Sequence, residues 1–250
     1  MRILFYPIEK VRENRQSAEV FARLTRSKRR NALRNRVLEG RFLLDGPARS
    51  GNTFATFAVK EALGIEDFIH HKHTVAAIKV ARSRKLPLYV LFRAPDDVAL
   101  SNALYASSRS TEFAWPFSLI NRRSQLMIDY YLYRWARYYQ FALSIEDVAF
   151  FSSEELFRAP EVLLKRIAAD LDRKGPFHGL NLSEEFFKKK EAQLLRQGNR
   201  VGAGIPNAQK EIAKKELESL VRKSRYLPDS MRIFERLTSL FVRESLCEPG

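Results

Sequence analysis

Short apolar runs alternate along the chain with longer stretches whose apolar residues recur at helical spacing. The short runs predict buried strands, and the longer stretches predict amphipathic helices. Strands are expected within residues 41–46, 66–74, 87–93 and 148–153, and helices within 53–63, 74–85, 98–108 and 160–171. Because strands alternate with helices, the pattern favours an α/β fold, a three-layer sandwich in which helices cover both faces of a short parallel sheet.

Residues 109–145 interrupt this alternation with an aromatic-rich segment that is mostly helical after Pro116. We interpret it as a helical insertion whose earlier part, 113–117, forms a loop or lid beside a pocket. Its aromatic stripe is expected to pack in the core, because buried helices usually supply such stripes. The stripe consists of Tyr131, Trp135, Tyr138 and Tyr139. On the expected helix 53–63, the shared apolar face would hold Phe54, Phe57, Ala58 and Ala62.

A length of 250 residues suits a single α/β domain, and we interpret residues 1–250 as one. Residues 1–40 form a basic N-terminal extension, and residues 172–250 form a long irregular segment followed by two helices. The 44 Lys and Arg residues exceed the 29 Asp and Glu residues by 15. This charge implies anionic partners, without choosing among nucleic acid, an acidic membrane surface and a polyanionic small molecule.

The single cysteine, Cys247, excludes an intrachain disulfide and a cysteine-based zinc cluster. This usage fits a reducing compartment, so we expect a cytoplasmic protein. No stretch reaches the roughly 18 apolar residues of a membrane span. The basic run from Arg26 to Arg36 is either a solvated helix face or a binding arm for an acidic partner.

The sharpest local motif is the sequence DGPARSGNTF at residues 45–54. From Gly46 to Thr53 it reads G-x-x-x-x-G-N-T, which matches a phosphate-binding P-loop in its glycine spacing and final hydroxyl. Asn52 replaces the P-loop lysine, which disfavours ordinary ATP or GTP hydrolysis, and a cation stands three positions earlier at Arg49. A strand entering such a loop and a helix leaving it make an anion cradle of backbone N–H groups.

A second motif, RAPDDVALS, follows the third expected strand at residues 93–101. Arg93 at the strand end and Ser101 in the next helix could both reach an anion at the carboxyl edge of the sheet, where α/β proteins bind ligands. The alternative is a salt bridge of Arg93 with Asp96 or Asp97, together with an ordinary helix serine.

Together these motifs resemble those of the sulfotransferases that use 3′-phosphoadenosine 5′-phosphosulfate (PAPS). In that family a loop of the form P-K-S-G-T-T or R-S-G-S-S binds the 5′-phosphosulfate, and residues 47–53 here read P-A-R-S-G-N-T. A family block close to R-x-P-x-D-x-x-x-S binds the 3′-phosphate and is similar to residues 93–101. A third, mainly structural block is represented by Glu155, Leu156 and Pro160. The resemblance covers about residues 41–171 and implies a P-loop kinase-like sulfotransferase fold.

The resemblance also implies a role for each matching residue. Arg49 would contact the bridging oxygen and the 5′-phosphate of PAPS, while Arg93 and Ser101 would hold the 3′-phosphate. The family implies no metal, since side-chain cations stabilise the charge on the departing phosphate. The family's C-terminal R-K-G block is poorly matched here and leaves Arg200 as a further candidate for the 3′-phosphate. The loop residues expected to bind the nucleotide are Ser50, Gly51, Asn52, Thr53 and Phe54.

The family uses a base for the acceptor hydroxyl, in many members a histidine at the end of the second strand. Here His71 and His73 stand at that place, and His73 is the better match although the family's following proline is missing. Strand alternation would put both rings on one face, and an ordinary histidine accepts a proton near neutrality. Glu66 is a third candidate, because some members use glutamate.

The resemblance thus implies an enzyme that moves a sulfuryl group from PAPS to a hydroxyl or amine of an acceptor. The R-S-G form of the loop suggests a carbohydrate or glycolipid acceptor, and the product nucleotide would be 3′-phosphoadenosine 5′-phosphate (PAP). A nucleotide or small-molecule kinase is the second hypothesis, which requires a loop lysine and an acidic metal-binding position. A non-catalytic nucleic-acid-binding protein using residues 23–36 is the third, disfavoured because no recognised nucleic-acid module is present.

Overall fold

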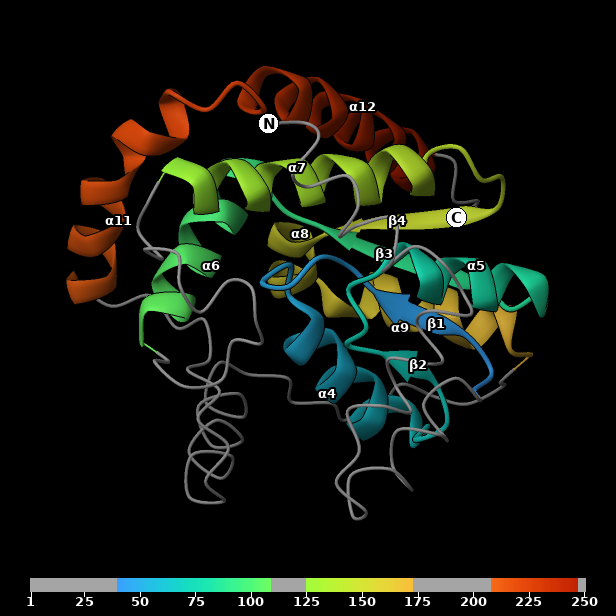
Figure 1. Cartoon of the computed structure of the whole chain (residues 1–250). Coiled ribbons are helices and arrows are strands. Elements are labelled where there is room, and N and C mark those ends of the chain that lie inside the picture. The colour runs from blue at the N-terminus through green and yellow to red at the C-terminus, as the bar shows by residue number, and fades with distance from the viewer. Residues whose placement is uncertain (1–39, 109–124, 173–207, 247–250) are drawn as a thin grey trace, which may run out of the picture.

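A four-stranded parallel sheet lies at the centre of the protein in the computed structural model, which describes residues 40–108, 125–172 and 208–246 (Figure 1). Leu43 pairs with both Ile69 and Leu88, and Leu88 pairs in turn with Val148. The strands are β1 (Leu43–Asp45), β2 (Ile69–His70), β3 (Leu88–Phe92) and β4 (Val148–Ser152), in the order β2-β1-β3-β4. The expected α/β class and parallel sheet are confirmed.

Helices follow each strand, as the sequence pattern predicts. The helices are α4 (Asn52–Leu63), α5 (Val75–Ser83), α6 (Pro95–Ser108), α7 (Gln125–Ala142), α8 (Ser153–Arg158), α9 (Pro160–Asp170), α11 (Ala208–Arg222) and α12 (Leu227–Leu246). Helix α6 begins earlier than expected, at Pro95, because proline suits a first helical turn and Asp96 and Asp97 favour a helix N-terminus. The short helix α8 was not expected.

Alternate residues of each strand point to opposite faces of the sheet, and each face carries its own hydrophobic core. Leu88, Val90 and Phe92 of β3 pack with α5, α7 and α12. Tyr89 and Leu91 pack on the other face with α4, α8 and α9. The sheet therefore lies between two layers of helices, as the alternation of strands and helices predicts.

The aromatic stripe of α7 packs in the core, as expected. Trp135 and Tyr139 are almost fully buried, and their polar atoms are satisfied by the backbone of β3. The Trp135 indole N–H donates to the carbonyl of Arg93 at 3.2 Å, and the Tyr139 hydroxyl donates to the carbonyl of Leu91 at 2.6 Å. These two bonds fix the carboxyl end of β3, next to the loop that follows β1.

The apolar face expected on α4 is buried to different depths. Ala55, Ala58 and Val59 are fully buried, whereas Phe54 and Phe57 are only half-buried. Small side chains face the sheet because the helix packs closely on β1 and α9. The Phe54 ring lies instead against the exposed Phe157 of α8, with 4.6 Å between ring centroids.

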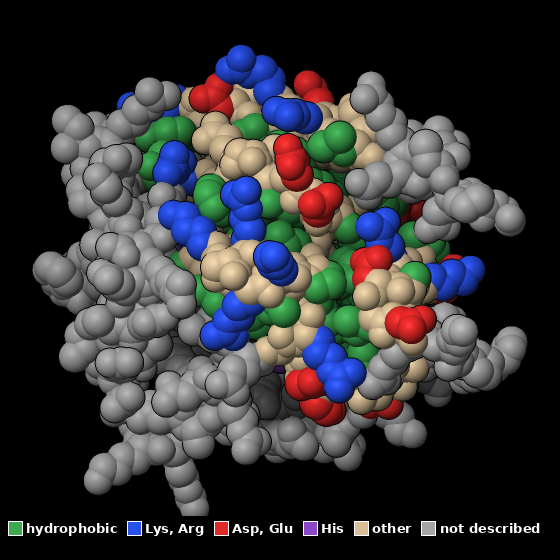
Figure 2. Space-filling view, turned by 90° about the vertical axis from the view of Figure 1, so that its right-hand side faces the viewer, with side chains coloured by type: hydrophobic (Ala, Val, Ile, Leu, Met, Phe, Trp, Pro, Cys, Tyr) green, Lys and Arg blue, Asp and Glu red, His purple; other side chains and the backbone are tan. Residues whose placement is uncertain are grey.

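Charged side chains are mixed over the face that carries the end of α5 and lies on the right in Figure 1. Figure 2 shows Lys and Arg there beside Asp and Glu rather than in a uniform cationic patch. Residues 1–39, 113–117, Arg200 and Cys247 lie outside the described part of the chain, so the expectations for them stay predictions. Among the helices that the structure describes, none has the length and apolar character needed to cross a membrane.

Candidate functional site

The carboxyl ends of the parallel strands bring the sequence motifs to one edge of the sheet (Figure 1). Loop 46–51 follows β1, and turn 71–74 follows β2. Ser153, at the start of α8, donates its hydroxyl to the carbonyls of Ser50 at 2.8 Å and Phe92 at 2.9 Å. This buried side chain ties the loop to the ends of β3 and β4, at the edge where α/β proteins bind ligands.

Loop 46–51 has the shape of an anion cradle. Arg49 and Gly51 both adopt left-handed backbone conformations, with φ of 76° and 83°. A Cβ at Gly46 would lie 2.3 Å from the carbonyl oxygen of Leu91, so the loop can pass β3 this closely only with glycine there. Gly51 caps α4 without a side chain, and the first turn holds no acidic residue. The N–H groups of that turn have no intrahelical partners and form the positive end of the helix dipole.

Two of the expected nucleotide-binding residues, Ser50 and Asn52, take part in the hydrogen bonds of the loop itself. The Asn52 amide donates to the carbonyls of Gly46 at 3.2 Å and Pro47 at 3.0 Å. Ser50 is fully buried, its N–H donates to Pro47, and its hydroxyl opposes the rise in pKa that burial gives the Tyr139 phenol. The Asn52 amide is engaged within the loop and Ser50 is fully buried, so an anion would rely on other main-chain N–H groups and on Arg49.

Arg49 joins the two motifs that lie far apart in the sequence. Its Nε donates to the Ser101 hydroxyl at 2.9 Å, across 52 positions of the chain. The Asn102 amide donates to the carbonyl of Ala48 at 3.1 Å and so holds α6 against the loop next to that contact. The guanidinium therefore lies between the loop and α6, where a bound phosphate would meet both.

Arg93 lies between β3 and α6 and pairs with Asp97 of α6. The Arg93 guanidinium donates from Nη2 at 2.7 Å and from Nε at 3.1 Å to the same carboxylate oxygen. This is the salt bridge that the sequence left open as an alternative. The side chain of Arg93 is 27% exposed, so it is not fully enclosed by this ion pair.

His73 is held to the loop by one ring nitrogen. Its Nδ1 lies 2.6 Å from the carbonyl of Gly46 and 3.3 Å from the carboxylate of Asp45. A carbonyl oxygen only accepts, so Nδ1 carries a proton, and in the neutral ring the lone pair is then on Nε2. A histidine in this tautomer can accept a proton at Nε2 from an acceptor group.

His71 lies between the loop and the other two histidines of the turn. Its Nε2 is 3.3 Å from the Thr53 hydroxyl, and its Nδ1 is 2.7 Å from Nδ1 of His70. Although His71 is exposed as a residue, desolvation of its ring and the nearby His73 and His70 lower its pKa, which keeps it neutral near pH 7. Desolvation, followed by the charge of Lys60, lowers the pKa of His70 to about 4.

The prediction that strand alternation places the His71 and His73 side chains on one face is wrong. Strand β2 ends at His70, and both histidines adopt left-handed conformations with φ of 53° and 54°. The centroids of the two rings are still only 5.8 Å apart, because the turn folds back over the loop. Residues held in this uncommon backbone region gather at functional sites more often than elsewhere.

Glu66 does not join this cluster. It precedes β2 and so lies toward the amino ends of the strands, away from the loops at their carboxyl ends. Its exposed carboxylate pairs with Lys60 at 2.6 Å. Phe54, by contrast, lies in the first turn of α4 directly after the loop and packs on Phe157.

Three candidate functional residues were not predicted from the sequence: Asp45, Asn102 and Ser153. Asp45 is fully buried at the end of β1 and accepts the backbone N–H groups of Lys72 at 3.2 Å and His73 at 2.7 Å. The available signal was a carboxylate at the end of an apolar strand, directly before the glycine of the loop.

The chain matches no protein-family model, and no curated protein or solved structure matches it either. Within residues 40–108, 125–172 and 208–246, no group of three His, Cys, Asp or Glu side chains is arranged to hold a metal ion.

Proposed function

We propose that this protein transfers a sulfuryl group from PAPS to a hydroxyl or amine of an acceptor, on a P-loop kinase-like fold. The observation that carries this proposal is the 2.9 Å contact between Arg49 and Ser101, which joins the two sequence blocks that resemble the nucleotide-binding blocks of sulfotransferases. A base candidate, His73, is bonded to the first residue of the same loop.

The chemistry of the donor set fits an anionic nucleotide. The loop offers main-chain N–H groups at a helix N-terminus without nearby acidic residues in α4, and Arg49 adds a fixed positive charge. PAPS supplies an activated sulfuryl group, whose bond to the 5′-phosphate breaks with the electron pair staying on the phosphate oxygen. Arg49 would stabilise that charge, with its guanidinium oriented by Ser101.

His73 would act on the acceptor. The acceptor proton moves to Nε2, since Nδ1–H is engaged with Gly46, and the freed acceptor atom bonds to sulfur. Arg93, whose side chain is 27% exposed beside Asp97, would bind the 3′-phosphate. The R-S-G form of the loop favours a carbohydrate or glycolipid as the acceptor, an argument by analogy with the family.

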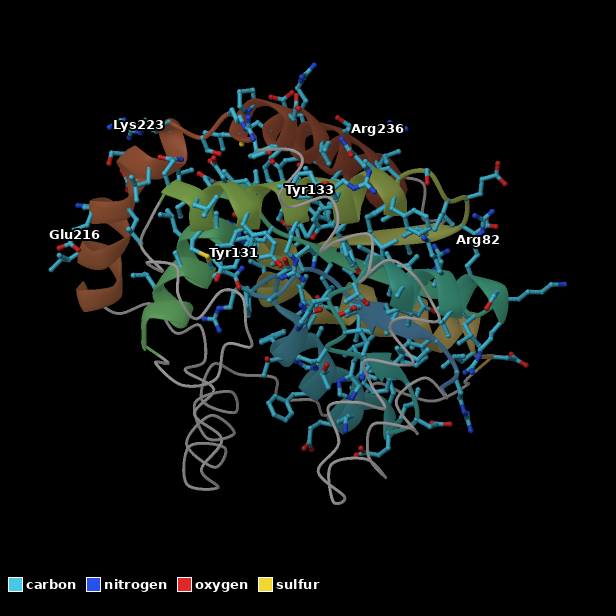
Figure 3. All side chains as sticks on the ribbon, in the orientation of Figure 1. Arg82, Tyr131, Tyr133, Glu216, Lys223 and Arg236 are labelled. Atoms are coloured by element: carbon cyan, nitrogen blue, oxygen red, sulfur yellow. The ribbon has the colours of Figure 1, made fainter. Side chains whose placement is uncertain are left out.

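The test is a transfer assay with PAPS and a panel of phenols, monosaccharides, a glycolipid and amines, followed by PAP release and by mass spectrometry of the products. His73→Asn is the sharpest variant, because asparagine can still donate to the Gly46 carbonyl but has no base at the Nε2 position. Arg49→Ala removes the loop cation. Arg82→Ala is the control, since Arg82 lies at the end of α5, on the right of the view and away from α6 (Figure 3).

Product from the wild type and from Arg82→Ala, with strong loss in the other two variants, is the expected result. A wild-type protein that neither binds PAP nor sulfates any acceptor overturns the proposal. Turnover that requires ATP and magnesium would instead support the kinase hypothesis.

A further inference from the structure

Asp45 is a carboxylate with no exposure to solvent, next to the base candidate. Its two oxygens accept the backbone N–H groups of Lys72 and His73, and one of them lies 3.3 Å from Nδ1 of His73. A buried charge is costly unless it is fully paired, so these contacts must offset the loss of water around the carboxylate.

Holding the turn does not by itself require a charge. A neutral side-chain oxygen can accept backbone N–H groups, as the Thr74 hydroxyl does from Ala77 at the start of α5. A full negative charge gains most when a nearby group becomes positive. The only titratable side chain that the structure bonds to Asp45, among the described residues, is His73.

The groups packed around His73 include one negative side chain that can pair with a positively charged ring. Arg134 of α7 donates to the backbone carbonyl of His73 at 3.2 Å, and the centroids of the His71 and His73 rings are 5.8 Å apart. Tyr138 of α7 is buried on the same side, where the charge of Asp45 adds to the desolvation that raises its pKa. Asp45 is the negative group in direct contact with the His73 ring, at 3.3 Å from Nδ1.

We propose that Asp45 is a positioning residue for His73: it holds the left-handed turn and the Nδ1–H tautomer, and it stabilises the imidazolium formed during transfer. This inference rests on the proposed function. The acceptor proton moves to Nε2, the acceptor electron pair forms the new bond to sulfur, and the old bond to sulfur breaks toward the phosphate. Asp45 stays a carboxylate throughout, and Nδ1 keeps its proton.

The first test is the tautomer of His73 in the wild-type protein, read from long-range ¹H–¹⁵N NMR spectra near neutral pH. The chain has four histidines, so the His73 signals can be assigned from the spectrum of His73→Asn. A protonated Nδ1 and a bare Nε2 are expected. A neutral ring that is protonated at Nε2 and bare at Nδ1 overturns the inference, and this measurement needs neither substrate nor a stable Asp45 variant.

The second test is Asp45→Asn, with Asp129→Asn as a matched control. Asp129 is also a buried carboxylate, which accepts from Ser224 at 2.6 Å and from Gln125 at 3.0 Å, on the α7 and α11–α12 side of the protein. Asp45→Asn should lower kcat by about 10²-fold, within the range of general-base catalysis, while KM for PAPS changes much less. Asp129→Asn should keep kcat.

The outcomes separate the two proposals. Normal wild-type turnover with unchanged kcat in Asp45→Asn overturns the role of Asp45 and leaves the sulfotransferase proposal standing. A wild-type protein without PAP binding and without turnover overturns the sulfotransferase proposal, and the role of Asp45 in transfer falls with it.

Discussion

Substitution of Gly46 by alanine tests the loop geometry most severely. The added Cβ would lie 2.3 Å from the carbonyl oxygen of Leu91, whereas real Cβ atoms essentially never come closer than 3.0 Å to such an atom. That oxygen also accepts the Tyr139 hydroxyl at 2.6 Å, so β3 cannot easily move away. The loop must therefore shift by at least about 0.7 Å, and the Gly46 carbonyl that holds His73 shifts with it.

Overpacking of this kind typically costs about 1–3 kcal/mol of unfolding free energy. For a chain of this length, such a loss lowers Tm by roughly 2–12 °C. The displaced loop should also weaken PAP binding by about tenfold or more, because anion cradles depend on the placement of their N–H groups. Thermal unfolding by circular dichroism and calorimetric titration with PAP measure the two effects.

Gly64→Ala is the matched control for this substitution. Gly64 ends α4 with φ of +60°, and nothing lies within 4 Å of an added Cβ, so alanine there costs roughly 1–2 kcal/mol of backbone strain. Stability should fall in both variants, but PAP binding only in Gly46→Ala. Wild-type Tm and wild-type PAP affinity in Gly46→Ala would refute the close approach of the loop to β3.

Two further predictions concern charge. Arg49→Ala should lower kcat by about 10²–10³-fold, as loss of one stabilising donor does in other enzymes, with little change in Tm because the guanidinium bonds a partly buried serine. Equal kcat in Arg49→Ala and Arg82→Ala would contradict this. The lowered pKa of His70 and His71 makes the charged rings unfavourable in the folded state, so stability should be complete above about pH 6.5 and fall as the pH drops toward 4. Urea unfolding across that range should show a shallower fall in His70→Asn, and an identical slope would refute the assignment.

Much of the fold could be predicted from the hydrophobic pattern. The apolar runs around Leu43, Leu88 and Val148 form parallel strands, and the aromatic stripe at Trp135 is buried in the core, as predicted. The apolar periodicity of α4 did not show that Phe54 lies at the margin of the core while Ala55, Ala58 and Val59 are fully buried, because spacing alone does not give the depth of burial.

The site could be predicted only as far as its local motifs reach. The loop and Arg49 follow from glycine spacing, and the approach of Ser101 follows from its place after β3. The role of Asp45 could not be seen, because it depends on the pairing of β1 with β2, which brings turn 71–74 onto that carboxylate. Strand alternation failed at His71 because the strand ends one residue earlier.

Binding of PAP, measured by calorimetry with AMP and with ATP plus magnesium as comparisons, tests the central claim most directly. The account predicts saturable binding that requires the 3′-phosphate, that weakens in Arg93→Ala and that is unchanged in Arg82→Ala. No binding of PAP, or a preference for ATP with magnesium, would contradict it.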